Sequence, residues 1–167
     1  MMKLDAFDKA AGYLGLMPRT EAEIRKYLKQ KEYSASEIND AVNRLLEYGY
    51  LNDVEYCQSY IRQAAAKGKG RRKMEQELAA KGVSRESIDA AWTALEEDSA
   101  DDKTAASLFD EKKRALEIAV KMTRQHLSDG KELDEKFLAK VGRRLAGQGY
   151  STDVIYFVTG KLRGLKK

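Results

Sequence analysis

A run of basic residues in the middle of the chain is the feature with the plainest chemistry. Five cations lie within seven residues, with two glycines and no acid among them: Lys67, Lys69, Arg71, Arg72 and Lys73. Clustered ammonium and guanidinium groups release counterions when they bind a polyanion, so phosphates or a carboxylate-rich groove are natural partners. The glycines place the run at a helix entrance, where backbone amides also favour anions. The alternative interpretation is a solvated loop without a partner.

Other basic residues lie on two further predicted helices, one that follows Thr20 and one that contains Val141. They are Arg25, Lys26 and Lys29 on the first, and Lys140, Arg143 and Arg144 on the second. If the repeated units described below stack side by side, these helices make a discontinuous basic stripe that binds a negatively charged partner. The acids in their first turns, such as Glu23 and Asp134, have a simpler interpretation as partners of the helix dipole.

The sequence lacks the sets of residues that catalysis and metal binding require. The chain holds one cysteine, Cys57, and one histidine, His126, which allow neither an internal disulfide nor a zinc-ligand set. Cys57 lies on an apolar helix face and is predicted to be buried, and His126 is predicted to have a surface or packing role. The sequence has no phosphate-binding glycine loop, no nucleophile elbow and no paired carboxylates in an apolar frame. We expect no enzymatic activity, no cofactor and no metal ion.

Composition narrows the class of protein. The 167 residues include 35% charged and 8% aromatic residues, and 31 bases against 27 acids give a net charge of +4. Apolar residues this sparse do not suit one thick core, as in a large sandwich or barrel. No apolar run is long enough to cross a bilayer, and the first residues lack the apolar stretch of a signal peptide. We expect a soluble, cytoplasmic monomer with no membrane partner and no small-molecule substrate.

Capping residues and apolar spacing predict helices throughout. Two capping boxes, Thr20 with Glu23 and Ser34 with Glu37, mark helix starts because each side chain satisfies an amide left unpaired there. After the second box, apolar residues recur at i, i+3, i+4, i+7 and i+8 before a glycine ends the run. The fold class predicted from this pattern is all-α.

The same pattern occurs three times. A shift of fifty residues places Ile24 on Met74, Leu28 on Leu78, Ile38 on Ile88 and Leu45 on Leu95, and a further shift of sixty-seven leads to Val141, Leu145, Ile155 and Leu162. We therefore predict three tandem three-helix, helix-turn-helix-like repeats over residues 1–50, 51–98 and 99–167, arranged as an elongated, curved array. In the third repeat, one apolar stripe predicts a single long helix over 100–128, about 44 Å in length, which either kinks or braces its neighbours.

The helix-turn-helix pattern also suggests a DNA reader whose last helix enters the major groove. The exposed positions of that helix are net acidic in the first two repeats, and Glu37, Asp40 and Glu86 are examples. Acidic side chains oppose the attraction to phosphates that dominates DNA affinity. Sequence-specific DNA recognition is therefore not the leading interpretation.

Short motifs in a fixed order carry a family resemblance. They are Gly49-Tyr50-Leu51-Asn52-Asp53 followed by Tyr56-Cys57 and Tyr60-Ile61, then Gly70, Glu77-Leu78, Lys81-Gly82-Val83 and Ile88, and finally Gly149-Tyr150 with Ile155. In this order and spacing the chain resembles RecX, the family of bacterial regulators of the RecA recombinase. Asn52 stands where the family's turn often carries a second aspartate.

The resemblance implies a cytoplasmic protein without enzymatic activity. It would bind in the groove of the RecA filament on DNA and mostly restrain ATP hydrolysis and strand exchange, in recombination, DNA repair and the SOS response. The family has no catalytic residues to carry over and no motif that fixes its contact residues. The basic residues named above are therefore the candidates for contact with the RecA filament or DNA.

Two other functions stay open. A general DNA-binding helical module without recombinase specificity would bind DNA alone with strong salt dependence, although the small net charge weighs against it. A helical scaffold for another protein would bind neither DNA nor the filament.

The array predicts a radius of gyration clearly above that of a compact globule of this length, which is about 15 Å by the usual scaling. Small-angle X-ray scattering on dilute protein at several concentrations measures this quantity. A value near that of the compact globule would rule out the elongated array.

Overall fold

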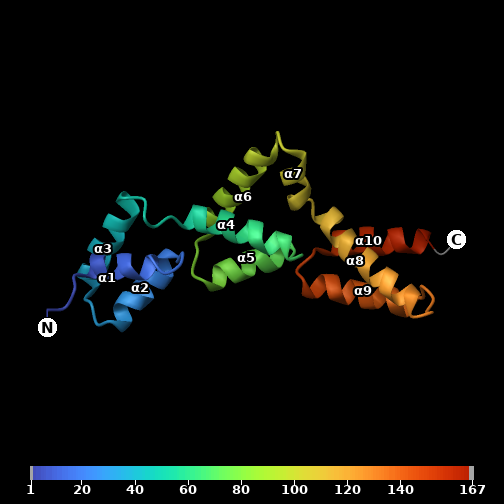
Figure 1. Ribbon diagram of the computed structural model, residues 1–167, viewed down its shortest axis with the longest axis horizontal. Helices are drawn as coiled ribbons and strands as arrows, with labels where there is room; N and C mark the ends of the chain where they lie inside the picture. The colour runs from blue at the N-terminus through green and yellow to red at the C-terminus, as the bar shows by residue number, and fades with distance from the viewer. Residues whose placement is uncertain (1, 166–167) are drawn as a thin grey trace. The chain divides into compact units, whose positions relative to one another are not determined.

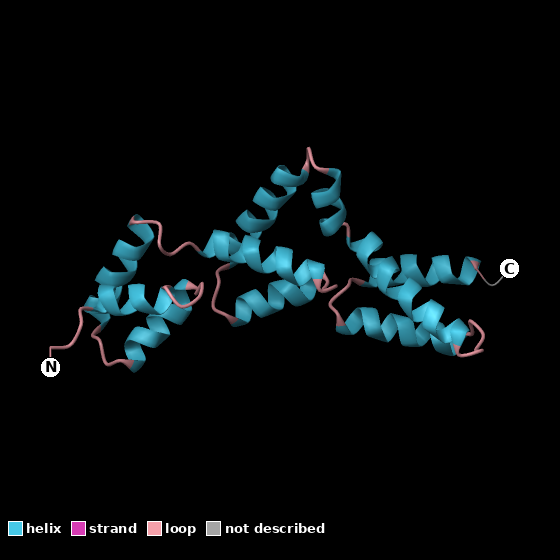
Figure 2. Cartoon of the chain, in the orientation of Figure 1, coloured by secondary structure: helices cyan, strands magenta, loops and turns pink. Residues whose placement is uncertain are grey.

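The structure is a computed structural model that describes residues 2–165, and every regular element among them is an α-helix (Figure 1, Figure 2). The all-α class predicted from the apolar spacing is confirmed. The helices are α1 (Ala6–Leu14), α2 (Glu21–Gln30), α3 (Ala35–Glu47), α4 (Asp53–Ala66), α5 (Arg71–Ala80), α6 (Arg85–Ser99), α7 (Lys103–Phe109), α8 (Glu111–Ser128), α9 (Glu135–Gly147) and α10 (Thr152–Gly164).

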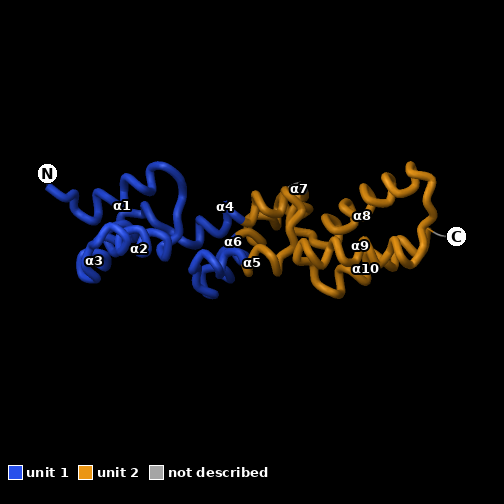
Figure 3. Tube along the Cα trace, turned by 90° about the horizontal axis from the view of Figure 1, so that it is seen from below, with its two compact units in different colours: residues 1–60, 77–94 blue, residues 61–76, 95–167 orange. Residues whose placement is uncertain are grey.

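The chain forms two compact units (Figure 3). Unit 1 comprises Met1–Tyr60 and Glu77–Ala94, and unit 2 comprises Ile61–Gln76 and Leu95–Lys167. Helices α4, α5 and α6 contribute residues to both units.

Helices α1, α2 and α3 enclose a core in unit 1. Both predicted capping boxes form: Thr20 Oγ1 accepts from the Glu23 amide, and Ser34 Oγ accepts from the Glu37 amide, each at 3.2 Å. The apolar faces that start from these caps are buried, and the core consists of Ala6, Ala10, Ile24, Leu28, Tyr33, Ile38, Ala41, Val42, Leu45 and Leu51. The caps fix where each helix begins and hence which residues face inward.

Helices α8, α9 and α10 enclose the corresponding core of unit 2. Its buried residues are Ala115, Ala119, Phe137, Leu138, Val141, Leu145, Tyr150, Val154, Val158 and Leu162. Of the apolar positions found by the second sequence shift, Val141, Leu145 and Leu162 are in this core, and Ile155 is partly buried against it. Cys57, on α4, is buried as expected, and burial raises the pKa of its thiol to about 11.

The single long helix predicted over 100–128 is wrong. Helix α7 ends at Phe109 and α8 begins at Glu111, with Asp110 between them in an extended conformation (ψ 98°). Asp110 Oδ1 accepts from the Lys113 amide at 3.1 Å and so caps the start of α8. Aspartate is a favoured N-cap because its short side chain satisfies these amides. The apolar stripe continues across the break, so its period does not show the interruption.

Within unit 1, the turn before α6 docks on the first turn of α2. Thr20 Oγ1 donates to the Lys81 carbonyl at 3.0 Å, and the Glu21 amide donates to Asp53 Oδ1 at 2.8 Å. Gly82 has φ +81°, and a Cβ on it would lie 2.4 Å from that of Ala22. Space as well as backbone conformation therefore requires glycine at this position.

Unit 2 contains the same junction, built from corresponding residues. The Gly70 amide donates to the Gln148 carbonyl at 2.7 Å, and the Arg71 amide donates to Glu111 Oε1, also at 2.7 Å. Gly149 has φ +88°, and a Cβ on it would lie 2.4 Å from that of Lys73. The shift of fifty relates Thr20 to Gly70, and the shift of sixty-seven relates Gly82 to Gly149. The sequence repeat thus includes the residues that form this junction, in which a glycine turn contacts the start of an earlier helix.

The departure at Asn52 preserves a helix cap. Asn52 Oδ1 accepts from the amides of Val54 and Glu55 at 3.1 and 3.2 Å. Asparagine and aspartate are about equally good N-caps, so α4 begins as it would with an aspartate.

Glu32 offers a test of backbone strain. It occupies the position that corresponds to Gly82 and Gly149 but carries a side chain at φ +62°. The left-handed conformation costs an L-residue about 1 kcal/mol. Glu32→Gly is therefore expected to raise the free energy of unfolding by up to about 1 kcal/mol. Urea denaturation followed by circular dichroism measures the change.

Gly82→Ala is the matched comparison. It adds the same backbone strain and also forces a methyl group against Ala22, so a loss of about 2 kcal/mol or more is expected. Destabilisation by Glu32→Gly would contradict the strain account.

Candidate partner-binding surfaces

The central basic run is divided between a loop and a helix. Lys67 and Lys69 lie in the loop after α4, and Arg71, Arg72 and Lys73 form the first turn of α5. Lys67 and Arg72 are exposed, and the other three residues are partly buried. The run is therefore not one uniform solvated loop.

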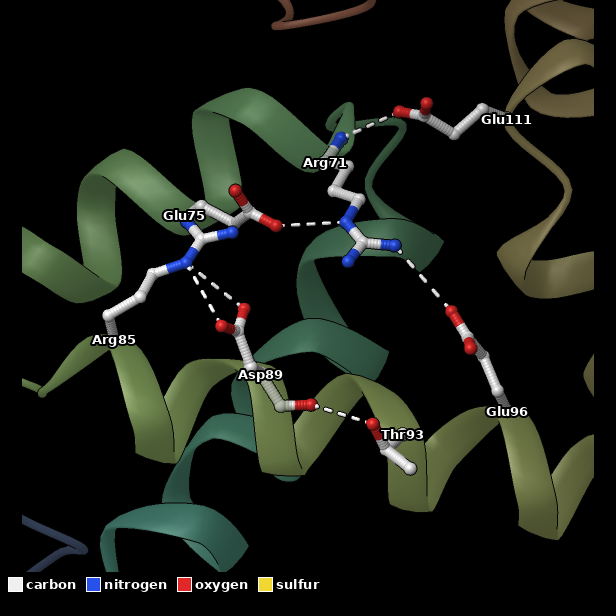
Figure 4. Close-up of polar contacts among 7 residues, drawn as sticks. All are labelled: Arg71, Glu75, Arg85, Asp89, Thr93, Glu96 and Glu111. Carbon is white, nitrogen blue, oxygen red and sulfur yellow. Dashed lines mark hydrogen bonds and ion pairs between the residues drawn. The ribbon is translucent and has the colours of Figure 1, made fainter.

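Arg71 interacts with three acids of its own unit (Figure 4). Its Nε lies 2.8 Å from Glu75 Oε1, and its Nη1 lies 3.5 Å from Glu96 Oε1. Its backbone amide donates to Glu111 Oε1. The chain itself thus supplies the anion that the start of a helix attracts. Arg71 contributes less net positive charge to the surface than the sequence indicates.

Lys73 also contributes to the fold. Its backbone and Cβ lie against Gly149, and its Nζ donates to the Gly147 carbonyl at 3.3 Å. Arg72, between these two residues, is exposed on α5. Lys67 and Arg72 are therefore the members of the run best placed to meet a partner.

Two buried side chains hold the loop that carries Lys67 and Lys69. Arg114 Nη1 donates to the Lys69 carbonyl at 2.6 Å, and the Tyr150 hydroxyl donates to the Gly68 carbonyl at 2.8 Å. Both side chains come from the core of unit 2, where Arg114 is 6% and Tyr150 2% exposed. Burial raises the pKa of Tyr150, which keeps its hydroxyl protonated as a donor. The core of unit 2 thus sets the position of this loop.

The predicted basic residues on α2 differ in their surroundings. Arg25 Nε lies 2.9 Å from Glu21 Oε1, and its Nη1 donates to Asn39 Oδ1 at 2.8 Å. Lys26 and Lys29 are exposed. Within unit 1, these two lysines are the better candidates for a partner contact.

The predicted cations of helix α9 all lie at the surface. Lys140, Arg143 and Arg144 are all exposed, and Lys140 and Arg143 line a groove beside the turn that joins α8 to α9. The groove also includes Lys136, which sequence reasoning missed. Lys136 lies four residues before Lys140, so helical spacing alone would have placed it on the same face.

His126 has the packing role that was expected of it. Its ring stacks on Phe137 with centroids 4.0 Å apart and planes at 20°, and its Nε2 lies 2.8 Å from the Glu132 carbonyl oxygen. Among residues 2–165, no group of His, Cys, Asp or Glu is arranged to hold a metal ion.

Acids pair with cations on the last helix of the first two predicted repeats. Arg44 on α3 lies 3.5 Å from Asp5 and 3.7 Å from Asp40, and Arg85 on α6 lies 3.0 Å from Asp89 (Figure 4). These pairs remove cations that a DNA-reading helix would direct at phosphates. The geometry supports the argument against sequence-specific recognition by α3 and α6.

Unit 1 presents an exposed apolar patch beside α1. Leu16, Met17, Tyr48 and Tyr50 are 79, 53, 59 and 65% exposed, and three of them line a hollow of about 580 Å³. The rings of Tyr48 and Tyr50 contact each other edge to face, with centroids 6.2 Å apart. Contiguous exposed apolar groups, and tyrosines above all, are typical of protein-binding surfaces.

No helix in the described part of the chain is both long and apolar enough to cross a membrane.

Two family models match the chain. The first three-helix domain of RecX matches residues 6–45, and the second matches residues 52–91. The regulatory protein RecX of Listeria monocytogenes serotype 4b (strain CLIP80459) is 32% identical over 148 residues, which cover 88% of this chain and 50% of that protein. The regulatory protein RecX of Vibrio vulnificus (strain CMCP6) is 29% identical over 150 residues, which cover 90% of this chain and 88% of that protein. The chain thus spans about half the length of the Listeria relative.

Solved structures share the fold. The crystal structure of RecX from Lactobacillus salivarius aligns with a TM-score of 0.77 at 20% identity, covering 95% of this chain and 94% of that one. A second crystal structure, of a regulatory protein RecX, aligns with a TM-score of 0.71 at 23% identity, covering 93% of this chain and 70% of that one.

Tyr150→Phe tests the anchoring of the basic loop. Removing the hydroxyl leaves the Gly68 carbonyl without this donor, and the free energy of unfolding is expected to fall by about 1 kcal/mol. Amide exchange of Gly68, Lys69 and Gly70, followed by mass spectrometry, is expected to become faster.

Tyr156→Phe serves as control because Tyr156 is 69% exposed. It is expected to change stability by less than about 0.5 kcal/mol. Equal exchange in the two variants would show that Tyr150 does not hold the loop.

Proposed function

Since the chain belongs to the RecX family of regulatory proteins, we propose that it regulates the RecA recombinase, mostly as an inhibitor. It binds the groove of the RecA filament on DNA and restrains ATP hydrolysis and strand exchange in recombination and DNA repair. The family match is the observation that carries the proposal. The three repeats over 1–50, 51–98 and 99–167 are part of the same proposal, and the two family models support the first two of them.

Two kinds of exposed surface support a partner made of protein and DNA. In unit 1, the apolar patch of Leu16, Met17, Tyr48 and Tyr50 suits a protein surface. In unit 2, the exposed cations Lys67, Arg72, Lys140, Arg143 and Arg144 suit phosphates or acidic side chains. A chain that makes several modest contacts gains avidity because each contact raises the effective concentration of the next.

The proposed mechanism is steric and electrostatic and assigns no catalytic step to the chain. A helical protein in the filament groove excludes the second DNA strand, which blocks strand exchange. It can also bridge protomers in a state that hydrolyses ATP slowly, or favour their release from the end of the filament. All three actions require binding to assembled RecA.

The second candidate is a general DNA-binding module without recombinase specificity. The exposed cations of α9 favour it, and the net charge of +4 limits it because acids elsewhere offset most of the bases. Such a module would bind bare DNA with steep salt dependence and would need no recombinase.

The deciding experiment titrates the protein into RecA that is hydrolysing ATP on single-stranded DNA. Two salt concentrations are compared, with the protein alone as a control. A fall in hydrolysis at substoichiometric protein indicates capping or disassembly, and a fall only near one molecule per several protomers indicates coating of the filament. Unchanged hydrolysis together with salt-sensitive binding to bare DNA would replace the proposal with the second candidate.

The double variant Lys67→Glu/Arg72→Glu tests the central run. Reversing two exposed charge contacts, each worth roughly 0.5–1 kcal/mol, is expected to raise the concentration for half-maximal inhibition by about tenfold. Arg71 is left unchanged because a glutamate there would face Glu75 and Glu96 and destabilise the fold. Circular dichroism checks that helicity is retained.

Lys103→Glu/Lys161→Glu is the control for this variant. Both residues are exposed in unit 2, and neither belongs to a candidate surface. The same inhibitory concentration for wild type and the Lys67/Arg72 variant would remove the central run from the proposed contact surface.

A further inference from the structure

A basic groove opens in unit 2 beside the turn that joins α8 to α9, and it contains more than the predicted cations of α9. It consists of two adjoining hollows of about 340 and 490 Å³, which share His126, Lys131, Phe137 and Lys140 in their walls. A groove of this size holds a nucleotide or a few side chains of a partner.

Five exposed cations line the groove. Lys121 comes from α8, Lys131 from the turn, and Lys136, Lys140 and Arg143 from α9. The three cations on α9 are separated by four and three residues, so they form one row with an axial rise of about 6 and 4.5 Å between neighbours. This spacing suits successive negative charges along an extended strand.

Three acids also lie in the walls: Asp129, Glu132 and Asp134. Two of them have internal partners, because Asp129 Oδ1 accepts from Gln125 Nε2 at 3.0 Å and Asp134 Oδ1 accepts from the Phe137 amide at 2.8 Å. Five cations against three acids leave the groove net positive.

His126 adds a fixed aromatic surface. Its ring is held by the stack on buried Phe137 and by the contact of Nε2 with the Glu132 carbonyl, and it lines both hollows while half-buried. Nucleic-acid bases stack on aromatic side chains, and grooves that combine such a platform with cations bind single strands. A duplex keeps its base faces stacked inside and could use the cations alone.

We propose that this groove binds a single-stranded polynucleotide, with phosphates on Lys136, Lys140 and Arg143 and a base against His126. The aromatic surface favours a nucleic acid over an acidic peptide, which would satisfy the cations and leave His126 unused. Binding of a polynucleotide in this groove requires no recombinase, so it can be tested apart from the proposed function.

The test measures binding of a fluorescein-labelled oligothymidylate to the full chain by fluorescence anisotropy at several salt concentrations. Lys136→Glu/Lys140→Glu/Arg143→Glu is expected to raise Kd at least tenfold. It is also expected to make the negative slope of log K (the association constant) against log salt shallower by about 2, since three phosphate contacts are lost. Lys103→Glu/Arg124→Glu/Lys161→Glu carries the same change of charge on exposed positions outside the groove. An equal loss in both variants would overturn the site.

The stacking role of His126 has its own variants. His126→Ala is expected to weaken binding about tenfold, whereas His126→Phe keeps a ring on Phe137 and retains most of the affinity. Wild-type affinity for both would overturn base stacking. Thermal melting by circular dichroism shows whether each variant is folded, and Lys140→Gln alone, with an expected loss of about threefold, replaces the triple variant if that variant is not.

Competition identifies the class of ligand. Unlabelled oligothymidylate is expected to displace the probe more effectively than an equal charge of duplex DNA or polyglutamate. Equal competition by polyglutamate would overturn the nucleic-acid assignment. A groove variant that loses oligonucleotide binding yet still inhibits RecA supports the groove as a separate site and leaves the filament proposal standing.

Discussion

Close backbone contact at the helix junctions is the constraint on which the rest of the structure depends. Gly82 against Ala22 in unit 1, and Gly149 against Lys73 in unit 2, leave no room for a β-carbon. A backbone that approaches a helix start this closely can exchange hydrogen bonds with it, as between Thr20 and Lys81. Protein interiors are close-packed and compress little. A junction in which backbone packs directly on backbone is therefore fixed more firmly than one made by flexible side chains.

The junction also decides which charges stay available at the surface. The helix start at Arg71 is part of the junction in unit 2, so the densest cluster of cations in the sequence lies where the fold needs hydrogen bonds and ion pairs. Glu111 and Glu75 engage Arg71, and the turn at Gly149 covers the base of Lys73. Lys140 and Arg143 on α9 are not among the residues of the junction contacts described above, and both are exposed. Charge density along a sequence is therefore a poor guide to charge density at a surface.

Short sequence patterns predicted the features of the fold that depend on contacts between residues close together in the sequence, such as helix starts. The capping boxes at Thr20 and Ser34 act between residues three apart, and both form as the sequence indicates. The break at Asp110 escaped detection because the apolar stripe crosses it unchanged, although an aspartate before a helix is a cap signal that could have been read. Two of the three partners of Arg71, in contrast, lie on α6 and α8, up to forty residues away, and no short-range pattern encodes such pairs.

The division of chemistry between the two units fits the proposed role as a regulator of a filament made of protein and DNA. The patch around Tyr48 and Tyr50 is apolar, so binding there would gain free energy from surface removed from water and would depend little on salt. Binding of a polyanion to the cations around Lys140 would release counterions, so it would depend steeply on salt. A net charge of only +4 limits attraction to bare DNA. For the proposed regulator, strong binding is therefore expected only where a protein surface and a polyanion occur together, because each contact raises the effective concentration of the other.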